Sequence, residues 1–184
     1  MRLTKTSRLA VFALAMALGS SLSFAAHKGE RGQLSSKDFK FAVDAAQGGM
    51  AEVQLGELAK TKATNPQVKT FAEKMVTDHN KANDELRQIL SRKGAVLPEG
   101  LPRKENAAMD DMQKATGQDF DKKYVEHMVK DHKKDVRDFQ DAAQSLTDPD
   151  LRAFAQKTLP TLQEHLRQIE QIEPAFSSRR ITSR

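Results

Sequence analysis

Apolar residues recur at steps of three and four along most of this 184-residue chain, a spacing that predicts amphipathic helices. The predicted long helices cover residues 36–61, 66–93, 118–146 and 149–172. Between the second and the third, residues 94–117 form a connection that begins with a stretch rich in proline and glycine and adds a short helix over 104–116. The pattern therefore predicts an all-α protein built from four long helices.

Two similar segments support a division of these helices into two hairpins. Asn65-Pro66 and Asp148-Pro149 each place a capping side chain before a proline at the first helical position. The ten residues from each cap match one another at a distance of 83 positions, and the same offset aligns Glu52 with Asp135. Two hairpins joined by a long connection are typical of ferritin-like proteins. Residues 36–172 are therefore predicted to form a ferritin-like antiparallel four-helix bundle with a long crossover between helices two and three.

A second repeat places histidines on the apolar faces of helices two and three. Glu73-Lys74-Met75-Val76-Thr77-Asp78-His79 returns 53 positions later as Glu126-His127-Met128-Val129-Lys130-Asp131-His132. His79 continues the apolar stripe of its helix, and His132 occupies the matching place in the second copy. We therefore expect the two imidazoles to face each other inside the bundle.

The start of the chain has the features of a signal peptide. Cationic residues lie within the first eight positions, an apolar run follows over 9–18, and Ser23-Phe24-Ala25 provides small residues at the −3 and −1 positions of a cleavage site. The apolar run is shorter than the ~20 residues that span a bilayer. Residues 1–25 are thus predicted to be cleaved, the mature protein to be periplasmic without a membrane span, and residues 26–35 to be a disordered start.

Charge and composition narrow the function. Removal of the leader, which carries three cations and no acids, lowers the formal charge from +5 to +2, so nucleic acid is not an expected partner. The absence of cysteine excludes disulfides and thiolate metal sites. Basic residues gather in a predicted flexible tail over 173–184, which offers at most a weak contact with the envelope surface. Nothing in the sequence identifies a protein partner.

The chain resembles an exported, ferritin-like bacterial family known as a domain of unknown function, whose members are described as periplasmic or outer-membrane proteins. The resemblance covers about residues 36–172 and implies the fold, but the family has no established general activity. The segments that carry it are 45–53, 71–79, 128–132 and 159–166.

Five polar residues are predicted to meet near the middle of the bundle, because the helical rise of 1.5 Å per residue puts them at similar depths. Imidazoles and carboxylates together suit a divalent transition metal, namely zinc, copper, iron, manganese or nickel. The predicted ligands are Glu52, His79, His132, Asp135 and, as a fifth, His165.

Two alternatives remain beside this metal site. In the first, His79 and His132 are hydrogen-bonded to Glu52 and Asp135 as a metal-free polar plug that fixes the helix register. In the second, thioethers from Met50, Met75 and Met128 join the histidines to bind Cu(I) or Ag(I), although methionine commonly fills cores.

The sequence therefore supports three functional hypotheses. The first is an exported ferritin-like binding or stress protein with a divalent metal at mid-bundle. The second is a metal-free structural or interaction protein of the cell envelope. The third is a redox enzyme with a degenerate dimetal site, which is disfavoured because neither copy of the repeat contains the Glu-x-x-His motif of di-iron bundles. Binding is thus favoured over catalysis.

Overall fold

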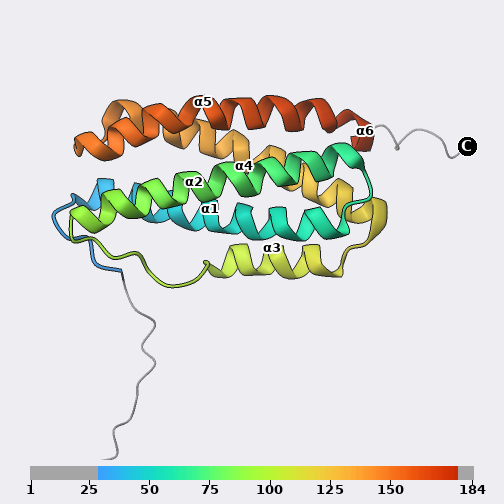
Figure 1. Cartoon of the computed structure of the whole chain (residues 1–184), viewed down its shortest axis with the longest axis horizontal. Coiled ribbons are helices and arrows are strands. Elements are labelled where there is room, and N and C mark those ends of the chain that lie inside the picture. The colour runs from blue at the N-terminus through green and yellow to red at the C-terminus, as the bar shows by residue number, and fades with distance from the viewer. Residues whose placement is uncertain (1–28, 178–184) are drawn as a thin grey trace, which may run out of the picture.

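The protein is described here by a computed structural model that covers residues 29–177. Four long helices lie side by side and a shorter helix runs along one side of them (Figure 1). The elements are α1 (Ser36–Lys62), α2 (Pro66–Arg92), α3 (Arg103–Lys114), α4 (Gly117–Ser145), α5 (Pro149–Ile172) and a final turn, α6 (Pro174–Ser177). The predicted all-α bundle with a long crossover, which contains α3, is confirmed.

Each hairpin turn ends at the cap that the sequence predicts. The Asn65 side chain accepts hydrogen bonds from the backbone N–H groups of Gln67 and Val68, at 2.8 and 3.4 Å. Asp148 does the same for Asp150 and Leu151, at 3.1 and 3.0 Å. These bonds satisfy amide groups that a helix start leaves without partners, so α2 and α5 begin at defined residues.

Each hairpin turn is also held by the other hairpin. The buried carboxylate of Asp121, near the start of α4, accepts hydrogen bonds from the backbone N–H groups of Thr64 and Asn65 in the α1–α2 turn. The buried carboxylate of Asp38, in the first turn of α1, accepts bonds from the backbone N–H and the hydroxyl of Thr147 in the α4–α5 turn. Asp121 and Thr147 lie 83 positions after Asp38 and Thr64, so the sequence repeat is matched by a reciprocal pair of contacts.

The hydrophobic core consists of two clusters. One contains Phe71, Tyr124 and Met128 and lies toward the end of the bundle with the α1–α2 turn. The other contains Leu86, Phe139 and Phe154 and lies toward the opposite end. Along α2, α4 and α5 the transition from one cluster to the other occurs at buried histidines, so a polar layer separates the two apolar regions.

Close packing of α1 against α2 depends on glycine. A Cβ atom on Gly49 would collide with the side-chain amide of the buried Asn83, and one on Gly56 would lie 2.9 Å from Val76 Cγ2. Gly48, in contrast, faces open space. Of these two adjacent glycines, Gly49 is therefore the one that allows the close approach of α2.

The structure revises the expected ends of the domain. Of the predicted disordered start, residues 29–35 are ordered: Glu30 pairs with Val96 of the crossover in an isolated antiparallel bridge, and Leu34 is buried. The predicted flexible tail begins as the short helix α6, whose Phe176 packs against the core. Backbone pairing and apolar burial order both segments. The predicted leader, residues 1–25, and the basic residues from 178 onward lie outside the described residues.

No helix within residues 29–177 combines the length and the apolar character needed to cross a membrane.

Candidate metal centre

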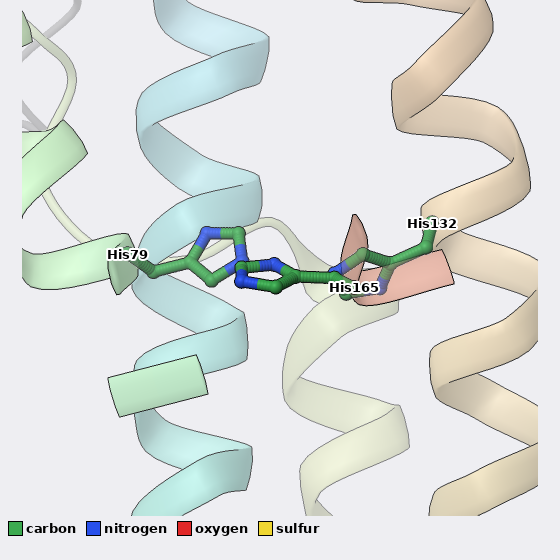
Figure 2. A group of neighbouring side chains, drawn as sticks. All are labelled: His79, His132 and His165. Atoms are coloured by element: carbon green, nitrogen blue, oxygen red, sulfur yellow. The ribbon is translucent and has the colours of Figure 1, made fainter. Parts of the chain in front are cut away.

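Three histidines from three helices meet in the polar layer. His79 on α2, His132 on α4 and His165 on α5 point toward a common centre (Figure 2). Their ring centroids are 5.4–5.8 Å apart, and each ring offers a nitrogen that lies within 4.8 Å of those of the other two. The three residues are 6%, 0% and 0% exposed, so water has little access to the rings.

Local sequence explains this convergence. His79 follows Met75 and His132 follows Met128, each by four residues, and both methionines are fully buried. Residues four apart lie on the same face of a helix, so each imidazole extends an apolar face. His165 similarly lies between Leu162 and Ile169 on the buried side of α5. Each ring thus points inward because its neighbours on the helix do.

One nitrogen of each ring is held by a neighbouring acceptor. Nδ1 of His79 lies 3.0 Å from Oε2 of Glu52 on α1. Nδ1 of His132 lies 3.0 Å from the backbone carbonyl oxygen of Met128 and 3.4 Å from Oε1 of Glu52. Nε2 of His165 lies 2.8 Å from Oδ2 of Asp78. Since carbonyl and carboxylate oxygens only accept, these nitrogens carry the protons.

The other nitrogen of each ring has no hydrogen-bond partner. Nε2 of His79, Nε2 of His132 and Nδ1 of His165 are all buried and unpaired. In neutral rings protonated as above, each of these atoms presents a lone pair. Buried ring nitrogens without partners are costly unless a donor or a cation satisfies them.

Burial and Glu52 together determine the charges. Burial alone would raise the pKa of Glu52. The two nearest imidazoles, His79 and His132, lower it by more, so the pKa falls to about 2. Burial also opposes protonation of His79, but the adjacent Glu52 carboxylate outweighs it and raises the His79 pKa. Burial prevails at the other two rings: it lowers the pKa of His132, and it lowers the pKa of His165 to about 4. The centre therefore contains a permanent carboxylate and two rings that remain neutral near pH 7. The third ring, His79, holds its second proton more tightly, and a bound metal ion would have to displace that proton from Nε2.

An aromatic wall closes the centre on the side of the α1–α2 turn. Phe71 packs against the rings of His132, His165 and Tyr124 in T-shaped geometry, with centroid distances of 6.2–6.4 Å. The Tyr124 hydroxyl is buried without a hydrogen-bond partner, and burial followed by the charge of Glu52 raises its pKa. This wall gives the centre an apolar surrounding.

The structure brings together four of the five residues predicted from the sequence. His79, His132 and His165 form the group, and Glu52 contacts two of them. Asp135 is not a member of the group and lies toward the outside, with Oδ1 3.9 Å from Nζ of Lys134.

The buried Met75 and Met128 belong to the apolar core cluster, as their core-filling interpretation expects. Thioether ligation therefore stays a prediction, as does a ligand role for Asp135.

Asp78 is a functional candidate that the sequence suggests only as a surface group or a local charge partner. It is 26% exposed in its side chain and also contacts Lys74, at 2.7 Å. Its position directly before His79 in the repeat was visible, but its partner, His165, lies 87 residues away on another hairpin. Only the packing of α2 against α5 reveals this contact.

Comparison with known protein families assigns the chain to one of them. The family described as a domain of unknown function, DUF4142, matches residues 23–172, and the chain belongs to it. No curated protein matches the sequence at a significant level.

Three solved structures show the same fold at low sequence identity. A DUF305 fragment from Deinococcus radiodurans has a TM-score of 0.69 and 12% identity, over 77% of this chain and 98% of that one. CopM in its Cu(II)-bound form has a TM-score of 0.65 and 16% identity, over 76% and 97%. A two-domain protein from Anabaena variabilis, with DJ-1-like and ferritin-like domains, has a TM-score of 0.60 and 16% identity, over 81% and 43%. The fold is therefore ferritin-like.

Proposed function

We propose that this protein is an exported metal-binding protein that holds one divalent transition-metal ion through His79, His132 and His165. The observation that carries the proposal is the group of three buried imidazole nitrogens without partners, one on each ring. Imidazole binds zinc, copper, nickel and iron well, and copper(II) is bound most tightly at a given nitrogen site. The Cu(II)-bound form of the structurally similar CopM agrees with this preference.

The outer contacts of the three rings suit a metal centre. Metal-binding histidines usually donate their second N–H to a carboxylate or a backbone carbonyl, which fixes the ring and strengthens its lone pair. Here Glu52, Met128 and Asp78 provide these acceptors. Three nitrogens bound at about 2.0–2.1 Å lie roughly 3.3–3.6 Å from one another, so shifts of about 1 Å close the site.

Binding explains the arrangement better than redox catalysis. Three imidazoles form a one-ion site, whereas dimetal centres of ferritin-like bundles need several bridging carboxylates. Among residues 29–177, Glu52 is the only acid in contact with two of the rings. The leader predicted over residues 1–25 supports export, so we assign metal capture or storage in the periplasm.

The competing hypothesis is a metal-free polar plug that joins the helices. The His79–Glu52 ion pair is its best support, since that pair needs no metal. It leaves the three inward nitrogens without partners, and for this reason we favour the metal.

Metal titration of protein without a histidine tag tests the proposal. After chelator treatment, we expect one equivalent of Cu²⁺ and of Zn²⁺ by elemental analysis and calorimetry, with nitrogen couplings in the Cu(II) EPR spectrum. His132→Gln should weaken binding by about 100-fold or more, beyond the 10–100-fold typical of outer contacts. His127→Gln, on the same helix but half-buried, is the matched control and should bind normally. Uptake of no metal at micromolar concentration would refute the proposal in favour of the plug.

A further inference from the structure

An acid-lined hollow opens on the outside of the bundle where α1, the start of α3 and α4 meet. It encloses about 210 Å³. Five carboxylates line it, against two lysines, Lys104 and Lys134. The acids are Asp44, Glu52, Glu105, Asp131 and Asp135. Lys134 is drawn aside, since its Nζ lies 2.6 Å from Asp138 Oδ2 but 3.9 Å from Asp135 Oδ1. The hollow therefore has an excess of negative charge.

Glu52, which contacts two of the three histidines, also lines the inner side of the hollow. It is only 3% exposed, and its Oε1 accepts no hydrogen bond and lies 3.4 Å from Nδ1 of His132. The other oxygen is the acceptor for His79. Gly48, one turn earlier on α1, leaves the space in front of Glu52 open, because a Cβ atom there would meet nothing within 4 Å. A single carboxylate therefore separates the hollow from the imidazoles.

Two further carboxyl groups, those of Asp131 and Asp135, line the hollow together with Glu52. Asp135 and Asp131 lie one turn apart on α4, so both face the hollow from the same side. Burial and the nearby charge of Glu52 raise the pKa of Asp135 to about 8. Asp131 Oδ2 lies 2.9 Å from Nε2 of His127, and these two residues and Glu105 on α3 each offer a ligand atom within 4.8 Å of the others. Asp135 therefore keeps its proton near pH 7 because of its burial and the acids around it, and a divalent cation bound beside it would displace that proton.

We propose that this hollow is an outer cation site, where Asp131 and Asp135 hold a hydrated divalent ion before it passes Glu52 to the three histidines. The inference rests on the proposed metal-binding function and adds the path by which the ion arrives. Carboxylates suit such an ion because they accept hydrogen bonds from its water shell and exchange it readily. The imidazoles then complete the transfer, because they displace that water with nitrogen ligands.

A hard cation probes the outer site separately. Mn²⁺ prefers oxygen ligands, and we expect one weakly bound Mn²⁺ per chain by EPR. The double variant Asp131→Asn/Asp135→Asn should lose it. Asp84→Asn, at an exposed acid of α2, is the control for charge and should retain it. Circular dichroism verifies that each variant is folded.

The rate of copper uptake probes the path. In stopped-flow measurements the double variant should take up Cu²⁺ about 10-fold more slowly than wild type, since acidic clefts raise the local concentration of cations. Gly48→Leu should slow uptake with no change of charge, because its side chain would fill the hollow. Both variants should still bind one Cu²⁺ at equilibrium.

Mn²⁺ binding and Cu²⁺ uptake test the outer site and the three-histidine site separately. If wild type takes up no copper, the three-histidine function fails, while Mn²⁺ that is bound and then lost in the double variant still supports the outer site. If Mn²⁺ binding is absent or unaffected by the double variant, the outer site is refuted. Copper uptake as fast in both hollow variants as in wild type would refute the path.

Discussion

Glu52 and Asp135 lie at matching positions of the two hairpins, 83 residues apart, yet their carboxyl groups have opposite properties. The neighbouring imidazoles of His79 and His132 lower the pKa of Glu52 to about 2. Burial without such partners, and the charge of Glu52 itself, raise the pKa of Asp135 to about 8. The repeat therefore provides one carboxylate that supports the histidines and one that faces the hollow.

We expect Glu52→Gln to weaken metal binding without abolishing it. The amide oxygen can still accept from His79, but the charge that strengthens the imidazole is lost, so affinity should fall about 10–100-fold with one metal ion still bound. The His79 pKa should also fall, because Glu52 raises it, and NMR titration of the metal-free protein measures this. Glu57→Gln, at an acid that pairs with Lys60 on the same helix, is the control. Equal affinities of wild type and Glu52→Gln would contradict this role.

Asp135→Asn should stabilise the metal-free protein at high pH. The folded-state pKa of Asp135 is about 8 against an ordinary value of 3.8, so only the folded state keeps the proton between these values, and stability falls as the pH rises from about 4 to 8. Removing the charge should gain on the order of 2 kcal/mol at pH 8.5. This is less than the full shift implies because the side chain is 22% exposed. Urea unfolding at pH 4 and 8.5 measures it, and a gain that is no larger at pH 8.5 than at pH 4 would contradict the prediction.

The metal-free Asp135→Asn protein should lose stability as the pH falls from 6.5 to 4.5. Burial holds the His165 pKa at about 4 in the folded state, against an ordinary value of 6.5. Only the unfolded state then gains the proton in this window, which costs on the order of 3 kcal/mol by pH 4. The raised pKa of His79 does not oppose this, because that ring is protonated in both states below pH 6.5. Stability that is flat or rising on acidification would argue against neutral buried rings.

Alanine at Gly48 and at Gly49 should have opposite effects. Gly48 faces open space, so alanine should stabilise the helix by about 0.5–1 kcal/mol. Gly49 lies against the Asn83 amide, so alanine there must displace a buried side chain and should cost roughly 1–3 kcal/mol. Thermal unfolding of the two variants compares them directly, and similar melting temperatures would show that α1 and α2 are not as close as described.

Local signals in the sequence predict the helices almost completely. The caps at Asn65 and Asp148 and the apolar spacing place the four long helices within a few residues of their observed ends. They also place His79 and His132 in the interior, because a residue four positions after a buried methionine shares its face.

Contacts between hairpins are the part that the sequence does not predict. Which oxygen pairs with which ring depends on the packing of α2 against α5 and of α1 against α4. The contact of Asp78 with His165 and the outward position of Asp135 follow from that packing. The order of residues 29–35 likewise depends on a partner in the crossover, Val96, and not on their own composition.

The reciprocal contacts of Asp38 with Thr147 and of Asp121 with Thr64 are those that two identical hairpins would make as a symmetric dimer. The single chain thus keeps the contact pattern of two subunits fused end to end. In a single chain the two halves need not be identical. In the histidine layer, for example, His132 of the second half occupies the position that Gly49 has in the first half. Divergence of the two halves thus lets this chain build a centre with three unlike corners.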